Sequence, residues 1–120
     1  MVQQGYGKHK GNNFENQIYK DLRDVIPDIK KTIGSGNSER DSDLISNDFI
    51  FELKRYKKID ESMIREWWMK VFDESILHER EPVIIYKENF KPIKVVLFTC
   101  IRDKSVMSTI NYDEFKEIVK

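Results

Sequence analysis

The sequence predicts a single α/β domain in which helices flank a mixed central sheet, with the element order αβββαββα. Three observations indicate this class. Residues 49–54 combine aromatic and β-branched side chains with apolar residues at alternating positions, as strands do. Residues 14–25 and 64–72 have apolar side chains at helical spacing. Residues 82–86 and 93–99 are almost continuously apolar, which is typical of strands buried on both faces.

The N-terminal region divides into an arm and a helix. Residues 1–11 are polar and rich in glycine, so we expect a flexible arm. Asn12 is the expected N-cap of the helix over residues 14–25, and Glu15 lies at the capping-box position. Pro27 ends or follows that helix.

Three strands are expected next. Residues 29–33 are the first, closed by the glycine-serine-glycine segment 34–36. Residues 41–45 and 49–54 then pair as a hairpin, because the residues 46–48 between them are common in turns.

The hairpin brings two carboxylates together. Side chains alternate along a strand, so one face carries Ile50, Glu52 and Lys54 and the other carries Phe49, Phe51 and Leu53. A two-residue loop at 47–48 places Asp43 opposite Glu52, a loop at 46–47 keeps them on one face, and only a three-residue loop separates them. Facing like charges are destabilising, and a cation between them would remove that penalty. Oxygen ligands suit Mg²⁺ or Mn²⁺.

Two further helices are predicted. Asp60 or Ser62 caps the first, whose wide apolar face is typical of a core or a subunit interface. The adjacent pair Trp67-Trp68 points about 100° apart, so one ring is expected under the sheet and the other at its edge or against a partner chain. Asn111 caps a short C-terminal helix, with a glutamate at the capping-box position.

Length and composition limit the class of protein. At 120 residues, 39% hydrophobic and 12% aromatic, the chain suits one globular domain. It has no run long enough to span a membrane and no apolar signal-peptide core, so a cytoplasmic location is expected, in the host cell if the protein is viral. The single Cys100 cannot form an intrachain disulfide and is expected to be buried.

Charge is balanced overall but unevenly distributed. The chain has 21 basic and 21 acidic residues, whereas nucleic-acid-binding proteins usually have a basic excess. Residues 54–58 nevertheless hold four cations and a tyrosine, and Lys8, His9 and Lys10 form a second basic patch. Two interpretations stay open: a basic rim around an acidic centre, as a metal-dependent phosphodiesterase needs, or a solvated, salt-bridged surface.

These features occur in a recognisable order. The chain contains, in sequence, Gly11-Asn12-Asn13-Phe14-Glu15, Gly34-Ser35-Gly36, Asp43, Glu52-Leu53-Lys54 and Pro82-Val83-Ile84-Ile85-Tyr86-Lys87. The aspartate followed by Glu-x-Lys resembles the D…(D/E)-x-K core of the PD-(D/E)XK nucleases. With the flanking elements, the chain resembles the archaeal and phage-type Holliday junction resolvases over residues 8–99. The resemblance implies a restriction-endonuclease-like fold.

The resemblance also implies a metal site. Asp43 and Glu52 would be protein ligands of Mg²⁺, with Mn²⁺ as the alternative, and the peptide carbonyl of Leu53 would be a third. A divalent metal lowers the pKa of bound water and acts as a Lewis acid, while Lys54 would orient the attacking water or neutralise the phosphate. Glu15 either contributes to the metal site, as in the resolvases, or serves only as the capping-box residue.

The DNA contacts follow from the same resemblance. Ser35 lies at the position of a serine used near the scissile phosphate, although turn chemistry also explains a serine between two glycines. The flanking glycines would let the backbone approach a phosphate closely. The residues expected to bind DNA are Lys8, Lys10, Gly34, Gly36, Arg55, Lys57 and Lys58.

The chain departs from the family pattern at two points. Ser42 replaces the proline that usually precedes the aspartate, at a position that varies in the superfamily. No glutamine can be placed on the helix after Lys54, so Arg65 or Lys70 fills that role or none is needed.

The sequence therefore predicts a Mg²⁺-dependent, structure-specific endodeoxyribonuclease of DNA recombination and repair, resolving four-way junctions by paired nicks that leave 5′-phosphates. The two symmetric cleavage sites of such a junction suggest a homodimer, with its interface on the Trp67-Trp68 helix or neighbouring strands. The alternatives are a restriction-like, flap or mismatch PD-(D/E)XK nuclease, a non-catalytic DNA-binding module, and an α/β protein with an accidental acidic pair. Its high Lys, Ile and Asn content suggests an AT-rich genome, which suits many phages.

Overall fold

The computed structural model describes residues 2–32 and 43–120, with side chains from Asn13 onward. Its sheet consists of β1 (Lys30–Lys31), β2 (Leu44–Ile45), β3 (Phe49–Tyr56), β4 (Glu81–Glu88), β5 (Lys94–Ile101) and β6 (Lys104–Asn111). The helices in these ranges are α1 (Val2–Arg23), α2 (Glu61–His78) and α3 (Tyr112–Val119). The strands lie in chain order, and all neighbours are antiparallel except β3 and β4, which are parallel. The predicted class, a mixed sheet flanked by helices, is confirmed.

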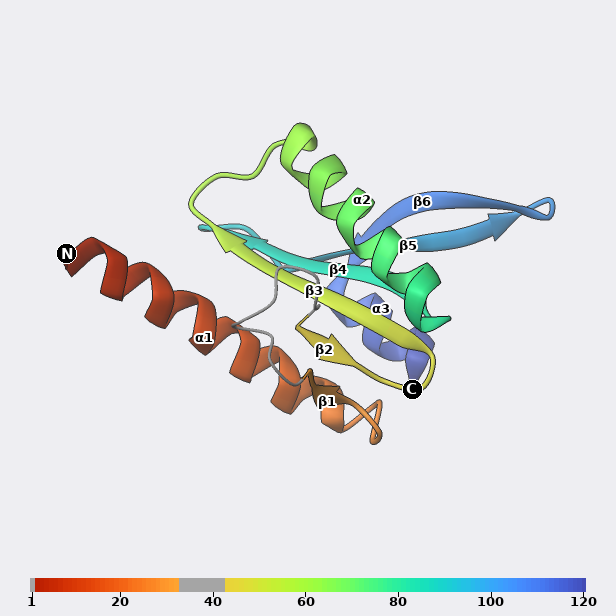
Figure 1. Cartoon of the computed structure of the whole chain (residues 1–120), viewed down its shortest axis with the longest axis horizontal. Coiled ribbons are helices and arrows are strands. Elements are labelled where there is room, and N and C mark those ends of the chain that lie inside the picture. Colours follow the sequence, from red (N-terminus) through yellow and green to blue (C-terminus); the bar gives the residue numbers. More distant parts are fainter. Residues whose placement is uncertain (1, 33–42) are drawn as a thin grey trace.

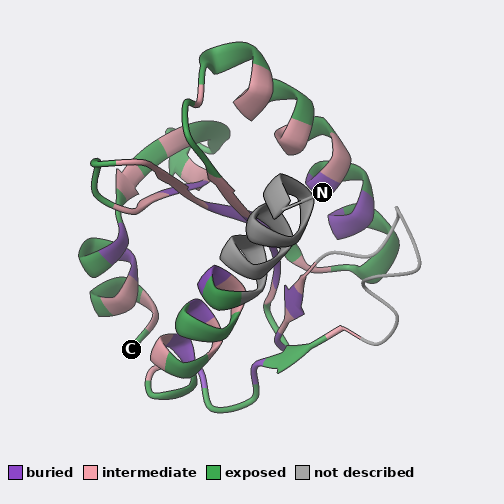
Figure 2. Ribbon diagram, turned by 90° about the vertical axis from the view of Figure 1, so that its left-hand side faces the viewer, coloured by how far each residue is buried: buried purple, intermediate pink, exposed green. Residues whose placement is uncertain are grey.

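The sheet lies between two helical layers. α2 covers one face, whereas α1 and α3 cover the other (Figure 1). In Figure 2 the buried residues of α1 form a stripe that faces the sheet, with exposed residues on the outer side. None of the helices in the described ranges is long and apolar enough to cross a membrane.

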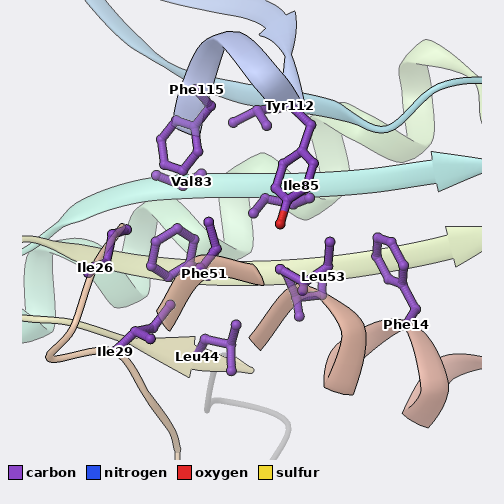
Figure 3. Packing of buried hydrophobic residues seen from close by; sticks show 13 residues of the cluster. Phe14, Ile26, Ile29, Leu44, Phe51, Leu53, Val83, Ile85, Tyr112 and Phe115 are labelled. Atoms are coloured by element: carbon purple, nitrogen blue, oxygen red, sulfur yellow. The ribbon is translucent and has the colours of Figure 1, made fainter. Parts of the chain in front are cut away.

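The two faces of β3 pack against different helical layers, as the predicted alternation of its side chains requires. Phe51 and Leu53 point into the larger core, between the sheet and the helices α1 and α3 (Figure 3). The ring of Phe51 meets that of Phe115 edge-on, with centroids 6.2 Å apart. The opposite face carries Ile50 into the smaller core under α2. Glu52 and Lys54 are therefore on the α2 side of a strand whose other side is tightly packed.

The first helix is longer than predicted. α1 begins at Val2, so Asn12 is not its N-cap, and residues 2–11, expected to form a flexible arm, are helical. Glycine within a helix costs about 1 kcal/mol relative to alanine but does not end the helix, and no proline interrupts residues 2–23. Glu15 consequently lies in the middle of α1, and the capping-box interpretation of this residue is wrong.

α2 begins as predicted. The Asp60 carboxylate accepts a hydrogen bond from the backbone N–H of Met63 at 3.0 Å, which confirms an aspartate N-cap. Both tryptophans pack against the sheet, each over a different strand. Trp67 stacks on Tyr56 of β3, and Trp68 meets Phe98 of β5 edge-on. Because the two rings point in different directions, each packs on a different strand.

The strand β6 was not predicted from the sequence. This strand pairs with β5 along its whole length, through a loop of Arg102 and Asp103 with φ of 51° and 65°. Such positive φ values suit a two-residue hairpin turn, but the pair lacks the Asn-Gly or Asp-Gly signal that usually announces one. Most residues of β6 are exposed, and its sequence does not alternate between apolar and polar side chains. The pattern that predicts a half-buried strand is therefore absent. Cys100 is exposed rather than buried, because β5 extends past the helical layers.

The last helix begins after Asn111, as predicted, but its expected capping box does not form. The side chain of Asn111 makes no capping hydrogen bond to the backbone. Its Oδ1 instead accepts a hydrogen bond from the Nζ of Lys94, and its amide donates to the Glu114 carboxylate at 3.1 Å. The Oδ1 of Asn111, which would accept a backbone N–H in a capping box, is therefore bound by a lysine of β5 instead.

Candidate active site

Glu52 is the centre of the site. Its side chain faces α2 and is 4% exposed, which is unusual for a carboxylate. The Oε1 atom lies 3.2 Å from the Nζ of Lys54 and 3.6 Å from the Nζ of Lys70, which comes from α2. A buried charge is tolerated only when it is paired, and these two cations supply the pairing. One carboxylate oxygen is thus held between the strand and the helix.

Asp43 comes to the same place from the residue before β2. The register Leu44↔Phe51 and Ile45↔Ile50 corresponds to the two-residue loop at 47–48, so that alternative of the hairpin prediction is confirmed. The backbone N–H of Asp43 donates to the Phe51 carbonyl at 2.9 Å, and its Oδ2 accepts from the Leu53 N–H at 2.7 Å. The carboxylate of Asp43 is therefore fixed at the edge of β3, beside Glu52.

The Asp43 carboxyl is held in an unfavourable environment for a negative charge. Its pKa is raised to about 7, mainly by burial, with smaller contributions from the charges of Glu52 and Glu15. The hydrogen bond from the Leu53 N–H and the ammonium of Lys54 act in the opposite direction, but they do not compensate. Burial therefore disfavours the ionised form of Asp43, and the charges of Glu52 and of Glu15 on α1 add to this effect.

The donor atoms fit a hard divalent cation. The Oε2 atom of Glu52 is buried and has no hydrogen-bond partner among the described residues. The N–H and C=O of one strand residue point to the same side, so the carbonyl of Leu53 faces Asp43 as its N–H does. Two carboxylates, one carbonyl and retained waters suit Mg²⁺. Within the described ranges, no three or more His, Cys, Asp or Glu side chains gather as a metal cluster, so Glu15 is not brought into one with Asp43 and Glu52.

Of the two residues on α2 that could replace the missing glutamine, Arg65 and Lys70, only Lys70 contacts the site. Arg65, the other candidate on α2, forms an exposed pair with Glu61 one helical turn away, at 3.5 Å, and points elsewhere. Lys70 instead contacts Glu52 and is three residues after Trp67, on the helix face that covers β3. Helical spacing relative to Trp67 is the signal that separates the two candidates.

The structure describes the side chains of only some of the residues that were predicted to bind DNA. Lys57 and Lys58 are exposed in the segment that follows β3. Arg55 is half-buried on the other face of β3, and its Nε has no hydrogen-bond partner among the described residues. Lys8 and Lys10 lie in α1, in the part of the helix without described side chains. Gly34, Ser35 and Gly36 lie outside the described residues.

A mixed sheet carrying an acidic pair and a lysine at the open edge of its central strand defines the class of the PD-(D/E)XK nucleases. The sequence profile of one family of this class, described as "Phage putative PDDEXK endonuclease", matches residues 6–118. The chain belongs to this family.

A solved structure supports the fold. The chain is similar to Hjc, a Holliday junction resolvase from the archaeal hyperthermophile Archaeoglobus fulgidus, with a TM-score of 0.51 and 13% sequence identity. The similarity covers 84% of this chain and 86% of the Hjc chain. A search of curated proteins finds no match. At this identity the comparison establishes the restriction-endonuclease-like fold and not the substrate.

Proposed function

We propose that this nuclease is a metal-dependent, structure-specific endodeoxyribonuclease that resolves four-way DNA junctions by paired nicks, leaving 5′-phosphates, in the cytoplasm of the host cell. The observation that carries the proposal is the pairing of Asp43 and Glu52 beside Lys54 at the edge of β3. The fold shared with an archaeal Holliday junction resolvase supports the choice of substrate.

The metal ligands in this proposal are Asp43, Glu52 and the carbonyl of Leu53, with Glu15 adding negative charge from α1. The ion would be Mg²⁺, with Mn²⁺ as the alternative. When bound, a divalent cation supplies Lewis acidity and an activated water at neutral pH. The Oε2 of Glu52, which has no hydrogen-bond partner among the described residues, and the raised pKa of Asp43 both favour a cation at this place, since each is relieved by one.

Two lysines complete the proposed chemistry. Lys54 would face the phosphate, orienting the attacking water and neutralising negative charge. Its Nζ is 5.7 Å from the centroid of the Trp67 ring, which restrains the side chain over the site. Lys70 would hold the Oε1 of Glu52 and so leave Oε2 directed at the metal. One cation then serves the substrate and the other orients a ligand.

The proposed DNA path surrounds this centre. Lys57 and Lys58 extend the positive charge of Lys54 beyond the end of β3, where they would contact phosphates. Arg55 would contribute from the α1 side of the strand, with Lys8 and Lys10 from α1 itself. Ser35, Gly34 and Gly36 would contact the backbone near the scissile phosphate.

We also propose a homodimer, with an interface on the outer side of α2. Met69 and Ile76 are 69% and 63% exposed and lie within about 20° of each other on the helix. Phe72 lies between them and contacts Phe98 of β5, which is paired with the exposed Met107 of β6. This apolar surface crosses from the helix to the hairpin, and a second copy would bury it across a two-fold axis.

Charge introduced into this surface should separate the dimer. The double substitution Met69→Glu and Ile76→Glu is expected to give a monomer at micromolar concentration, because two carboxylates would be desolvated at each half of the interface. Sedimentation velocity measures the mass. Leu77→Glu is the matched control, since Leu77 is 76% exposed but turned about 100° from Ile76, and it should remain dimeric. A wild-type monomer would contradict the proposal.

The proposed activity is tested with a labelled synthetic four-way junction and Mg²⁺. Paired symmetric nicks are expected, and they should disappear with Asp43→Ala while a fully paired linear duplex remains uncut. Equal cleavage of linear duplex would indicate a restriction-like enzyme of the same class. Tight junction binding without cleavage of any DNA would replace the enzyme with a binding module.

A further inference from the structure

An aromatic stack continues the line of site residues along β3. Tyr56 is the next residue after Lys54 on the face that carries Glu52. Its ring stacks on that of Trp67 from α2, with centroids 5.5 Å apart and planes 19° from parallel. Tyr56 is 44% exposed, so much of its ring is open to solvent. We call this pair the Tyr56–Trp67 stack.

The stack is physically joined to the acidic site. The Trp67 ring is the same one that lies near the Nζ of Lys54, and Lys54 in turn contacts the Oε1 of Glu52. Two residues of strand span about 7 Å, so Tyr56 lies one such step from the lysine. If Lys54 contacts the phosphate of a DNA strand, the nucleotide next to that phosphate would lie over the stack.

The charges around the stack suit a nucleic-acid backbone. Lys57 and Lys58 follow Tyr56 directly and are exposed. Glu88 of β4 is the register partner of Tyr56. Its carboxylate is engaged by Lys91 at 2.8 Å and by the backbone N–H of Ile59 at 2.7 Å, so its charge is largely compensated. Aromatic rings bordered by exposed cations are the combination that binds unpaired nucleotides.

We propose that the Tyr56–Trp67 stack receives an unpaired base of the DNA next to the cleaved phosphate. The base would lie on the side of the Tyr56 ring that Trp67 leaves open. The preferred substrate class is then DNA with at least one unstacked nucleotide beside the scissile bond, which a fully paired linear duplex does not provide. This inference rests on the proposed nuclease function, because it uses Lys54 as the phosphate contact.

The test compares one substitution of Tyr56 that keeps the aromatic ring with one that removes it. Tyr56→Phe keeps the ring, whereas Tyr56→Leu keeps apolar bulk against Trp67 but removes the stacking surface. The probes are a duplex with one extrahelical 2-aminopurine and the fully paired duplex of the same sequence, in metal-free buffer that prevents cleavage. Affinity is measured by anisotropy, and stacking by quenching of the 2-aminopurine fluorescence.

We expect Tyr56→Leu to weaken binding of the extrahelical probe by roughly tenfold and to remove the quenching, since stacking of one base contributes about this much. Tyr56→Phe should behave like the wild type, and the paired duplex should bind all proteins equally. Phe90→Ala, at a fully exposed aromatic residue in the β4–β5 turn, is the control and should change neither probe.

The outcomes separate this inference from the proposed function. Unchanged quenching and affinity in Tyr56→Leu, or an equal loss for both duplexes, would overturn the stacking inference even if the wild type cuts junctions. Selective loss of the extrahelical probe would support the inference even if no DNA were cleaved with Mg²⁺. Absence of DNA binding by the wild type would overturn both.

Discussion

Replacing Glu52 by glutamine is expected to lower the rate of junction cleavage by about a thousandfold or more. The change removes one of the two charged ligands of the proposed metal site, an effect of several kcal/mol, and each 1.4 kcal/mol corresponds to about tenfold in rate. Glutamine has nearly the same shape, so the contacts of Oε1 with Lys54 and Lys70 are retained in part and the core of β3 is not disturbed. Single-turnover rates with saturating DNA and Mg²⁺ measure the loss.

The same substitution elsewhere in the chain provides the control. Glu61→Gln changes an exposed carboxylate on α2, whose ion-pair contact is with Arg65, and it should leave cleavage unchanged. Isothermal titration with Mg²⁺ should show loss of binding for Glu52→Gln alone. A rate within tenfold of the wild type for Glu52→Gln would remove this residue from the metal site.

Metal affinity is expected to depend steeply on pH below about 7. The pKa of Asp43 is raised to about 7 by burial, the largest cause, together with the charges of Glu52 and Glu15. A cation binds the deprotonated carboxylate, so below this pKa each unit of pH requires a proton to be displaced and raises the apparent Kd about tenfold. Above it the carboxylate is already ionised and the Kd should be constant. Calorimetric titrations between about pH 5.5 and 8.5 would trace this curve.

Two substitutions should move the break in this curve in opposite directions. Glu15→Gln removes a negative charge that raises the pKa of Asp43, so the break should shift to lower pH. Lys54→Met removes a positive charge that lowers it, so the break should shift to higher pH. An apparent Kd that does not change over this range, or a break near the ordinary value for aspartate, would show that the burial of Asp43 does not control the site.

Much of the candidate site was predictable because it is encoded locally. Alternation along a strand decides that Glu52 and Lys54 share a face, and a two-residue loop decides how Asp43 approaches them. The aspartate N-cap of α2 is likewise a matter of a few adjacent residues. Each of these features depends on backbone geometry over fewer than a dozen residues, so no knowledge of the folded chain was needed.

Other features depend on residues that meet only after folding. The choice of Lys70 over Arg65 follows from the rotation of α2 on the sheet, which the packing of Trp67 sets. The start of α1 and the presence of β6 follow from helix continuation and strand pairing, not from local stop signals or alternation.

The sequence by itself determined the class of fold and the identity of the acidic pair, because strand period and hairpin loop length act within the chain segment that carries them. Only the tertiary structure decided the chemical state of that pair. The raised pKa of Asp43 arises from burial and from charges on β3 and α1. Within the described part of the chain, both lysines contact the Oε1 of Glu52 and leave its Oε2 without a hydrogen-bond partner. Burial and electrostatic interaction depend on distances through space, which the order of residues along the chain does not contain.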